Sequence, residues 1–215
     1  MSLLDKKMVR VLGPWAFLLA AAAMAQSPAS AEVPPAAGSS AAERDCFDFS
    51  SLKPGTKYEL ADTVKAAHAT ITIEDYLGTR APAESRGVWI TNTRLAGGTT
   101  PELRTYLMNA QVMPDVPVRE VTLNIAEASS GGAAPHANIE VNGEKYVVIG
   151  GLAGINGTVI GNSATGNAAV VVNLAPAAAG NWSVGTLELH ATKGKIESFA
   201  FGGLHVFLNN ICFMK

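Results

Sequence analysis

The feature that most constrains the fold is a series of short runs in which apolar and polar residues alternate. Residues 68–74, 118–125 and 138–142 are such runs, and they place aliphatic side chains at every second position over 69–73, 121–125 and 139–141. Successive side chains of a strand point to opposite faces, so each run predicts a strand with one dry and one wet face. No long segment has helical periodicity, and the pattern therefore predicts an all-β chain.

Turn residues divide these runs in the way that antiparallel sheets require. Asn142-Gly143 separates Val141 from the run 145–149 and predicts a hairpin, because both turn residues tolerate positive φ. Further strands are expected at 157–160, 168–174, 183–192, 195–201 and 204–213, with turns at Lys193-Gly194 and Gly202-Gly203. Residues 99–108, with a Thr cap and an early Pro, predict one short helix or turn. Roughly ten to twelve strands at this spacing predict an antiparallel two-sheet sandwich or jelly roll.

The first residues predict export. Lys6, Lys7 and Arg10 precede an apolar run, 11–24, and small-residue cleavage sites follow at Ala25 and Ala31. This is the layout of a signal peptide, and the run is shorter than the ~20 residues of a membrane-spanning helix. We therefore expect a signal peptide at 1–31, a flexible tether of Ala, Ser, Pro and Gly at 32–44, and a β-sandwich domain at 45–215. The exported protein would be periplasmic, extracellular or attached to the cell surface.

Two cysteines, Cys46 and Cys212, stand at the two ends of the expected domain. Thiols of exported proteins persist as disulfides, so one intramolecular bond is expected. A loop of this length stabilises the fold by about 5 kcal/mol in the chain-entropy model. The alternatives are two free thiols or a catalytic cysteine, which needs a setting that lowers its pKa.

Charge argues against a nucleic-acid partner. Removal of the leader takes away three basic residues and one acidic residue, which leaves 13 basic against 17 acidic residues and a net charge of −4. The rest of the chain has no cluster of Lys and Arg to neutralise phosphates. It also has no second apolar stretch of membrane-spanning length.

The ends and the middle of the domain carry motifs. They read Cys46-Phe-Asp-Phe-Ser-Ser-Leu-Lys-Pro-Gly-Thr-Lys-Tyr58, Ser130-Gly-Gly followed by Ala137-Asn-Ile-Glu-Val-Asn-Gly143, and Ile196 to Phe213 with Gly202-Gly203. This pattern resembles an uncharacterised family of exported bacterial β-sandwich proteins and is similar to galactose-binding-like jelly rolls used as carbohydrate-binding modules. The resemblance implies a sandwich closed by its last strand, and a role in binding. Leu204-His205 replaces the Gln-Glu of the family pattern.

In related jelly rolls a carboxylate near the last strand helps to hold structural calcium. Asn209 or Asn210 stands there in this chain, with Asp45 and Asp48 as further weak candidates. Calcium prefers charged oxygen ligands, so we expect no occupied site at these four residues and no cofactor.

Signatures of catalysis are missing from the sequence. The four histidines, at 68, 136, 190 and 205, lack metal-ligand spacing, and no nucleophile motif is present. A pair of carboxylates such as Glu120 and Glu127 leaves glycan hydrolysis as a remote alternative.

A non-catalytic module that binds polysaccharide or another surface polymer is the leading interpretation. Aromatic rings with a polar edge suit half-wet binding sites. The candidate residues are Trp182, Tyr146, Trp89, Tyr106, Arg94, Asn138 and Asn142, with Glu140 as a polar partner. The alternative is a structural or adhesive surface protein that acts through protein contacts or self-assembly, because the small-residue region 150–180 could form weakly charged strand edges. The sequence leaves the oligomeric state open.

Overall fold

The computed structural model describes residues 43–76, 86–95, 99–128, 135–162, 164–177 and 181–215. These residues form two antiparallel sheets and one short 3₁₀ helix, η3 (Leu152–Ile155). The expected signal peptide and residues 32–42 of the expected tether lie outside the described residues, whereas Arg44 already belongs to a strand. Among the helices in these ranges, none is long and apolar enough to cross a membrane.

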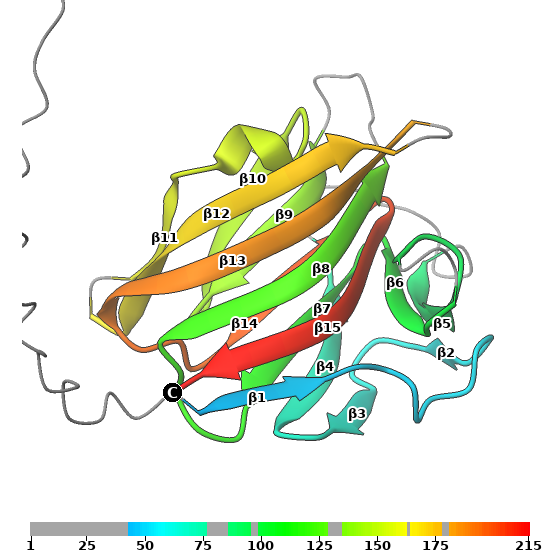
Figure 1. The fold of residues 1–215 in the computed structure, drawn as a ribbon, viewed down its shortest axis with the longest axis horizontal. Coiled ribbons are helices and arrows are strands. Elements are labelled where there is room, and N and C mark those ends of the chain that lie inside the picture. Colours follow the sequence, from blue (N-terminus) through cyan, green and yellow to red (C-terminus); the bar gives the residue numbers. More distant parts are fainter. Residues whose placement is uncertain (1–42, 77–85, 96–98, 129–134, 163, 178–180) are drawn as a thin grey trace, which may run out of the picture. The chain divides into compact units, whose positions relative to one another are not determined.

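The larger sheet has nine strands, and β1 and β15 bring the two ends of the domain side by side in it (Figure 1). Its order is β11 (Val159–Asn162), β12 (Gly166–Pro176), β13 (Trp182–Gly194), β8 (Glu120–Ala128), β15 (Val206–Met214), β6 (Glu102–Tyr106), β5 (Gly87–Thr91) and β2 (Lys57–Tyr58), with β1 (Arg44–Phe47) paired to β15.

The smaller sheet has six strands and packs against the larger one. Its order is β10 (Glu144–Ile149), β9 (Pro135–Val141), β14 (Phe199–Gly203), β7 (Met108–Pro114), β4 (Ala69–Asp75) and β3 (Thr63–Ala66). The predicted turn joins β9 to β10, with φ of 50° at Asn142 and 81° at Gly143. The predicted antiparallel two-sheet sandwich is confirmed.

The core lies between the two sheets because the strands alternate as the sequence predicts. In β8, Val121, Leu123 and Ile125 are fully buried, while the residues between them face outward. The largest buried side chains include Phe49, Phe199, Phe201 and Phe213. Each sheet therefore has an inner face that forms the core and an outer face available for other roles.

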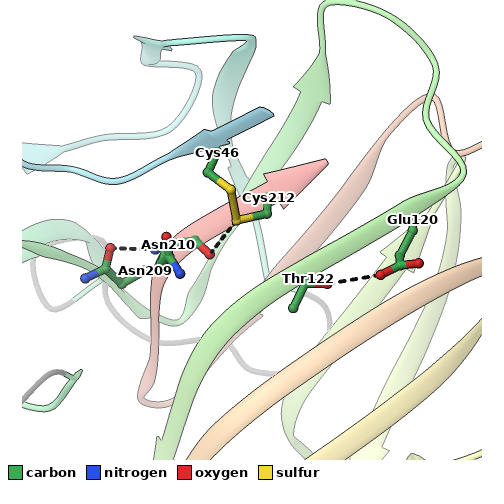
Figure 2. Close-up of a disulfide and its surroundings, with 6 residues drawn as sticks. All are labelled: Cys46, Glu120, Thr122, Asn209, Asn210 and Cys212. Atoms are coloured by element: carbon green, nitrogen blue, oxygen red, sulfur yellow. Dashed lines mark hydrogen bonds between the residues drawn. A yellow bond between two sulfur atoms is a disulfide. The ribbon is translucent and has the colours of Figure 1, made fainter. Parts of the chain in front are cut away.

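The disulfide holds the first strand to the last. Cys46 and Cys212 are direct register partners, and they form the expected bond (Figure 2). An irregularity between Asn209 and Cys212 divides β15, which pairs with β6 through residues 206–208 and with β1 through residues 211–214. The bond therefore fixes β1 where β6 has ended.

Four local predictions are wrong. Lys193-Gly194, where a turn was expected, is the paired end of β13. Residues 102–106 of the expected helix form β6, because Leu103 and Thr105 point into the core and their neighbours point outward, which is the period of a strand. Gly202-Gly203 lies inside β14 instead of forming a turn. The strand expected from residue 195 begins at Phe199, and Ile196 forms only an isolated bridge with Val118.

Candidate functional site

A row of side chains crosses the outer face of the larger sheet. Lys57 is the register partner of Trp89, Trp89 of Arg104, and Arg104 of Phe207. Directly opposed residues of antiparallel strands lie on the same face, so these four side chains are neighbours. With the residues that contact them they form the cation–aromatic strip: Lys57, Trp89, Arg94, Arg104, Tyr106, Trp182, His205 and Phe207.

Cations and rings alternate along the strip. Trp89 lies between two cations, because Lys57 Nζ and Arg104 Cζ are each 5.5 Å from its ring centroid. Arg94 Cζ is 4.1 Å from the centroid of Trp182. Each such contact is worth ~0.5–1 kcal/mol at an exposed site and fixes the orientation of the charged group.

The His205 ring contacts Arg104, Tyr106 and Trp182 and lies near the charge of Arg94. Arg104 Nη2 is 3.2 Å from His205 Nδ1, and the imidazole centroid is 4.8 Å from that of Tyr106. A guanidinium can only donate, so Nδ1 accepts this bond and carries no proton. Burial, and then the charges of Arg104 and Arg94, lower the pKa of His205, which agrees with a neutral imidazole.

A buried carboxylate holds the segment that carries Arg94. Glu102 is completely buried, and its two oxygens accept backbone N–H groups of residues 93–95 at 2.6–3.2 Å. The hydroxyl of Thr91 donates to the same carboxylate at 2.9 Å. Charge-assisted bonds of this kind are strong, so the position of Arg94 above Trp182 is set by the strand beneath it.

The two arginines have little local compensation. Within the described ranges, neither the Arg94 nor the Arg104 guanidinium forms an ion pair with a carboxylate, and Nε of Arg104 is buried with no acceptor. Lys57, in contrast, pairs with Glu59 at 2.7 Å. As far as the described residues go, the strip therefore presents two positive charges that have no carboxylate partner and are held on aromatic rings.

The structure brings together four of the seven residues expected to bind a ligand, namely Trp89, Arg94, Tyr106 and Trp182. Tyr146 and Asn138 lie on the smaller sheet, and Asn138 is buried. Asn142 is at the β9–β10 turn, where its side chain donates to the carbonyl of Lys195 at 2.8 Å and accepts the N–H of Glu197 at 2.7 Å.

Sequence reasoning missed Lys57, which the pairing of β2 with β5 brings beside Trp89. It also missed Arg104, His205 and Phe207. Their place in the strip depends on the pairing of β15 with β6 and β8, a contact between segments about a hundred residues apart. The only local signal was the alternation of Leu103 and Thr105 with Arg104, which the helix expectation obscured.

The four weak calcium candidates bind other partners. Asp45 lies 2.8 Å from Lys215 Nζ, and this contact lowers the pKa of Asp45. Asp48 accepts the N–H of Ser50. The side chain of Asn209 accepts the N–H of Asn210 (Figure 2). It also donates to the hydroxyl of Thr100. Nothing in these contacts gathers the four residues around one point.

One other group of metal-ligating side chains occurs in the described part of the chain: Glu120, Glu188 and His190, with ligand atoms within 4.8 Å of one another. Nδ1 of His190 is 3.3 Å from Glu120, and Nε2 is 2.8 Å from Glu188. Both ring nitrogens therefore already face a carboxylate, and the trio forms an ion-pair network at the end of the outer face opposite the strip.

No protein-family model and no curated protein matches the chain. Among solved structures, the chain is similar to the K2 cleaved adhesin domain of Lys-gingipain, with a TM-score of 0.40 and 13% identity over 80% of this chain and 98% of that domain. A similarity at this level says nothing about ligand or partner.

Proposed function

We propose that the protein is an exported, non-catalytic binding module whose cation–aromatic strip binds an acidic polysaccharide or a comparable anionic polymer of the cell surface. The observation that carries this proposal is the pair Arg94 and Arg104, two guanidinium groups on the outer face that have no carboxylate partner in the part of the chain that the structure describes. Export is supported by the expected signal peptide and by the Cys46–Cys212 bond, since disulfides persist outside the reducing cytoplasm.

An anionic ligand fits the chemistry of the strip. A guanidinium whose plane lies against a ring keeps its N–H edge free, and that edge matches the two oxygens of a carboxylate or sulfate. The tryptophan and tyrosine rings offer apolar area to the C–H faces of a sugar. The row from Lys57 to Phe207 crosses four strands, about 14 Å, which favours an extended ligand over a single small molecule.

Binding without turnover is the better interpretation because the titratable groups of the strip already have partners. Nδ1 of His205 accepts a bond from Arg104, and the carboxylate of Glu102 is enclosed by backbone N–H groups. Neither group is placed as a general acid or base for a ligand lying on the strip.

Calorimetric titration of the oxidised protein with polygalacturonate and with its fully methyl-esterified, uncharged form would test the proposal. We expect binding of the acidic polymer that weakens with salt, and at least tenfold weaker binding in Arg94→Gln and Arg104→Gln. Arg44→Gln, an exposed arginine outside the strip, is the matched control. A broader panel of acidic glycans extends the test, and no binding across it would overturn the proposal. If both polymers bind equally well, the ligand is still a polysaccharide, but its negative charge does not contribute to binding.

Self-assembly remains the second candidate because apolar residues are exposed at adjacent edges of the two sheets. On β10, Val147 and Ile149 are 38% and 61% exposed, and on β11, Val159 is 53% exposed. Strand edges with apolar side chains are ready sites for association. Concentration-dependent sedimentation that Ile149→Asp abolishes would favour this candidate, whereas a monomer at all concentrations would exclude it.

A further inference from the structure

The outer face of the smaller sheet carries a polar row that the proposed function does not use. Glu74 on β4 is the register partner of Asn109 on β7, which pairs with Gly202 on β14, which in turn pairs with Asn138 on β9. Glu140 lies two residues beyond Asn138 on the same face. We call Glu74, Asn109, Asn138 and Glu140 the polar row.

Asn109, Asn138 and Glu140 are buried and Glu74 is half-buried, and each has at least one side-chain atom without a hydrogen-bond partner among the described residues. Asn109, Asn138 and Glu140 are 0%, 1% and 2% exposed. The atoms without a hydrogen-bond partner are Glu74 Oε2, both amide atoms of Asn109, both amide atoms of Asn138, and Glu140 Oε2. Burial of a polar group without a partner costs ~1–3 kcal/mol, so six such atoms in one row require an explanation.

Gly202 leaves space in the centre of the row. A Cβ atom at this position would overlap with Oδ1 of Asn109 and with the carbonyl oxygen of Met108. The Asn109 amide thus lies over the glycine, between its own strand and the strand of Asn138. The row is built so that two amides and two carboxylates share one part of the face.

The charges in the row are unbalanced. Burial raises the pKa of Glu74, and the negative charge of Glu140 raises it further. Lys145 compensates in part, with Nζ 3.6 Å from Oε2 of Glu140. Two carboxylates against one lysine leave a net negative charge in a buried setting, which is costly unless a further cation is present.

We propose that the polar row binds a calcium ion. It offers four oxygens that accept no hydrogen bond, from two carboxylates and two side-chain amides, and Lys145 is the one cation near them among the described residues. Carboxylate and amide oxygens are hard ligands of the kind that Ca²⁺ takes. Water would satisfy hydrogen bonds but would not offset the second carboxylate, whereas a divalent cation does. The row has no imidazole or thiolate to favour zinc or copper, and Mg²⁺ prefers to keep several of its waters.

The proposal is tested by calorimetry and thermal unfolding of the oxidised full-length protein, stripped with EDTA and titrated with CaCl₂. We expect saturable binding of one ion and a rise in Tm of several degrees. Glu74→Gln and Glu140→Gln should each weaken binding at least tenfold. Glu74→Gln preserves shape and mimics a protonated acid, so it keeps the test valid if Glu140→Gln folds poorly.

The matched control is Glu188→Gln in the half-buried Glu120, Glu188 and His190 trio, the other group in the described ranges that could hold an ion. We expect it to bind Ca²⁺ like the wild type. The proposal is overturned if the wild-type protein does not bind Ca²⁺ at millimolar concentration. It is equally overturned if Glu188→Gln loses binding while Glu74→Gln retains it.

Discussion

The outer faces of the two sheets differ in whether their polar side chains have interaction partners. On the larger sheet, Arg94 lies on Trp182, Arg104 on Trp89 and His205, and the Glu102 carboxylate on backbone N–H groups. On the smaller sheet, the polar row holds six buried amide and carboxylate atoms that have no hydrogen-bond partner in the described part of the chain, and only Glu140 has a nearby cation, Lys145. Among the described residues, the first face leaves one buried polar atom without a hydrogen bond, Nε of Arg104, whereas the polar row of the second face leaves six.

This difference separates two kinds of binding site. A strip whose side chains hold each other in place loses little entropy when an extended ligand settles on it, so it suits reversible surface recognition. A buried row with unmet hydrogen bonds and excess charge instead suits a small ion that becomes part of the fold. The comparison fails if the side chains of the strip do not stabilise one another. It also fails if the unpartnered atoms of the polar row do not lower the free energy of unfolding.

The largest expected effect comes from Glu102→Ala. The substitution leaves the N–H groups of Thr93, Arg94 and Leu95 without their acceptor, and the bond to Leu95 is buried. We expect a loss of about 3 kcal/mol in unfolding free energy. Urea denaturation measures this loss. Glu188→Ala, which removes only a partly exposed ion pair with His190, should cost under about 1 kcal/mol. Equal costs for the two variants would show that the Arg94 segment does not depend on Glu102.

A smaller loss is expected from Gly202→Ala. The new methyl group meets the Asn109 amide and the Met108 carbonyl in the middle of the smaller sheet, which should cost about 1–3 kcal/mol. Gly154→Ala in η3 is the control, because a Cβ there has no atom within 4 Å. Thermal unfolding compares the two variants. If Gly202→Ala does not change the stability, the side chains of the polar row can move aside without loss.

The sequence predicted the parts of the fold that depend on local pattern. Alternation within β4, β8 and β9 defined the faces of both sheets, and Asn142-Gly143 defined a hairpin. The disulfide pairing was predictable because only two cysteines exist. The helix expected at 99–108 failed because its cap signals outweighed a short strand pattern that pairing with β5 and β15 stabilises.

The candidate sites were less predictable, because strand order and register join residues that are distant in the sequence. Trp89 and Trp182 were identifiable as aromatic candidates, but Arg104 and His205 enter the strip only through the β6–β15 pairing. The polar row was harder to find. Asn138 and Glu140 alternate with apolar residues and therefore indicate a wet face, whereas the structure buries them.

A double-mutant cycle tests whether the strip holds itself together. Arg94→Ala, Trp182→Ala and the double variant should give a coupling energy of about 0.5–1 kcal/mol, because guanidinium and indole are in direct contact. Urea denaturation of the four proteins supplies the cycle. A cycle on Arg94 and Trp89, for which no contact is recorded, should give no coupling. Zero coupling for Arg94 and Trp182 would make the strip a loose set of exposed side chains.

The smallest effect, the pH dependence of stability, has opposite signs on the two faces. The pKa of His205 is lowered from 6.5, so the unfolded chain binds more protons and stability falls as the pH drops below that value. The pKa of Glu74 is raised from 4.5, so the folded chain binds more protons and stability falls as the pH rises above that value. Urea denaturation in EDTA at about pH 7, 6 and 5 separates the two. His205→Gln should remove the loss on acidification, while Glu74→Gln should deepen it, since the opposing gain from the carboxyl group disappears. If both variants show the same pH dependence of unfolding free energy as the wild type, neither His205 nor Glu74 contributes to it. The contrast between a neutral imidazole on one face and a carboxyl group of raised pKa on the other would then be wrong.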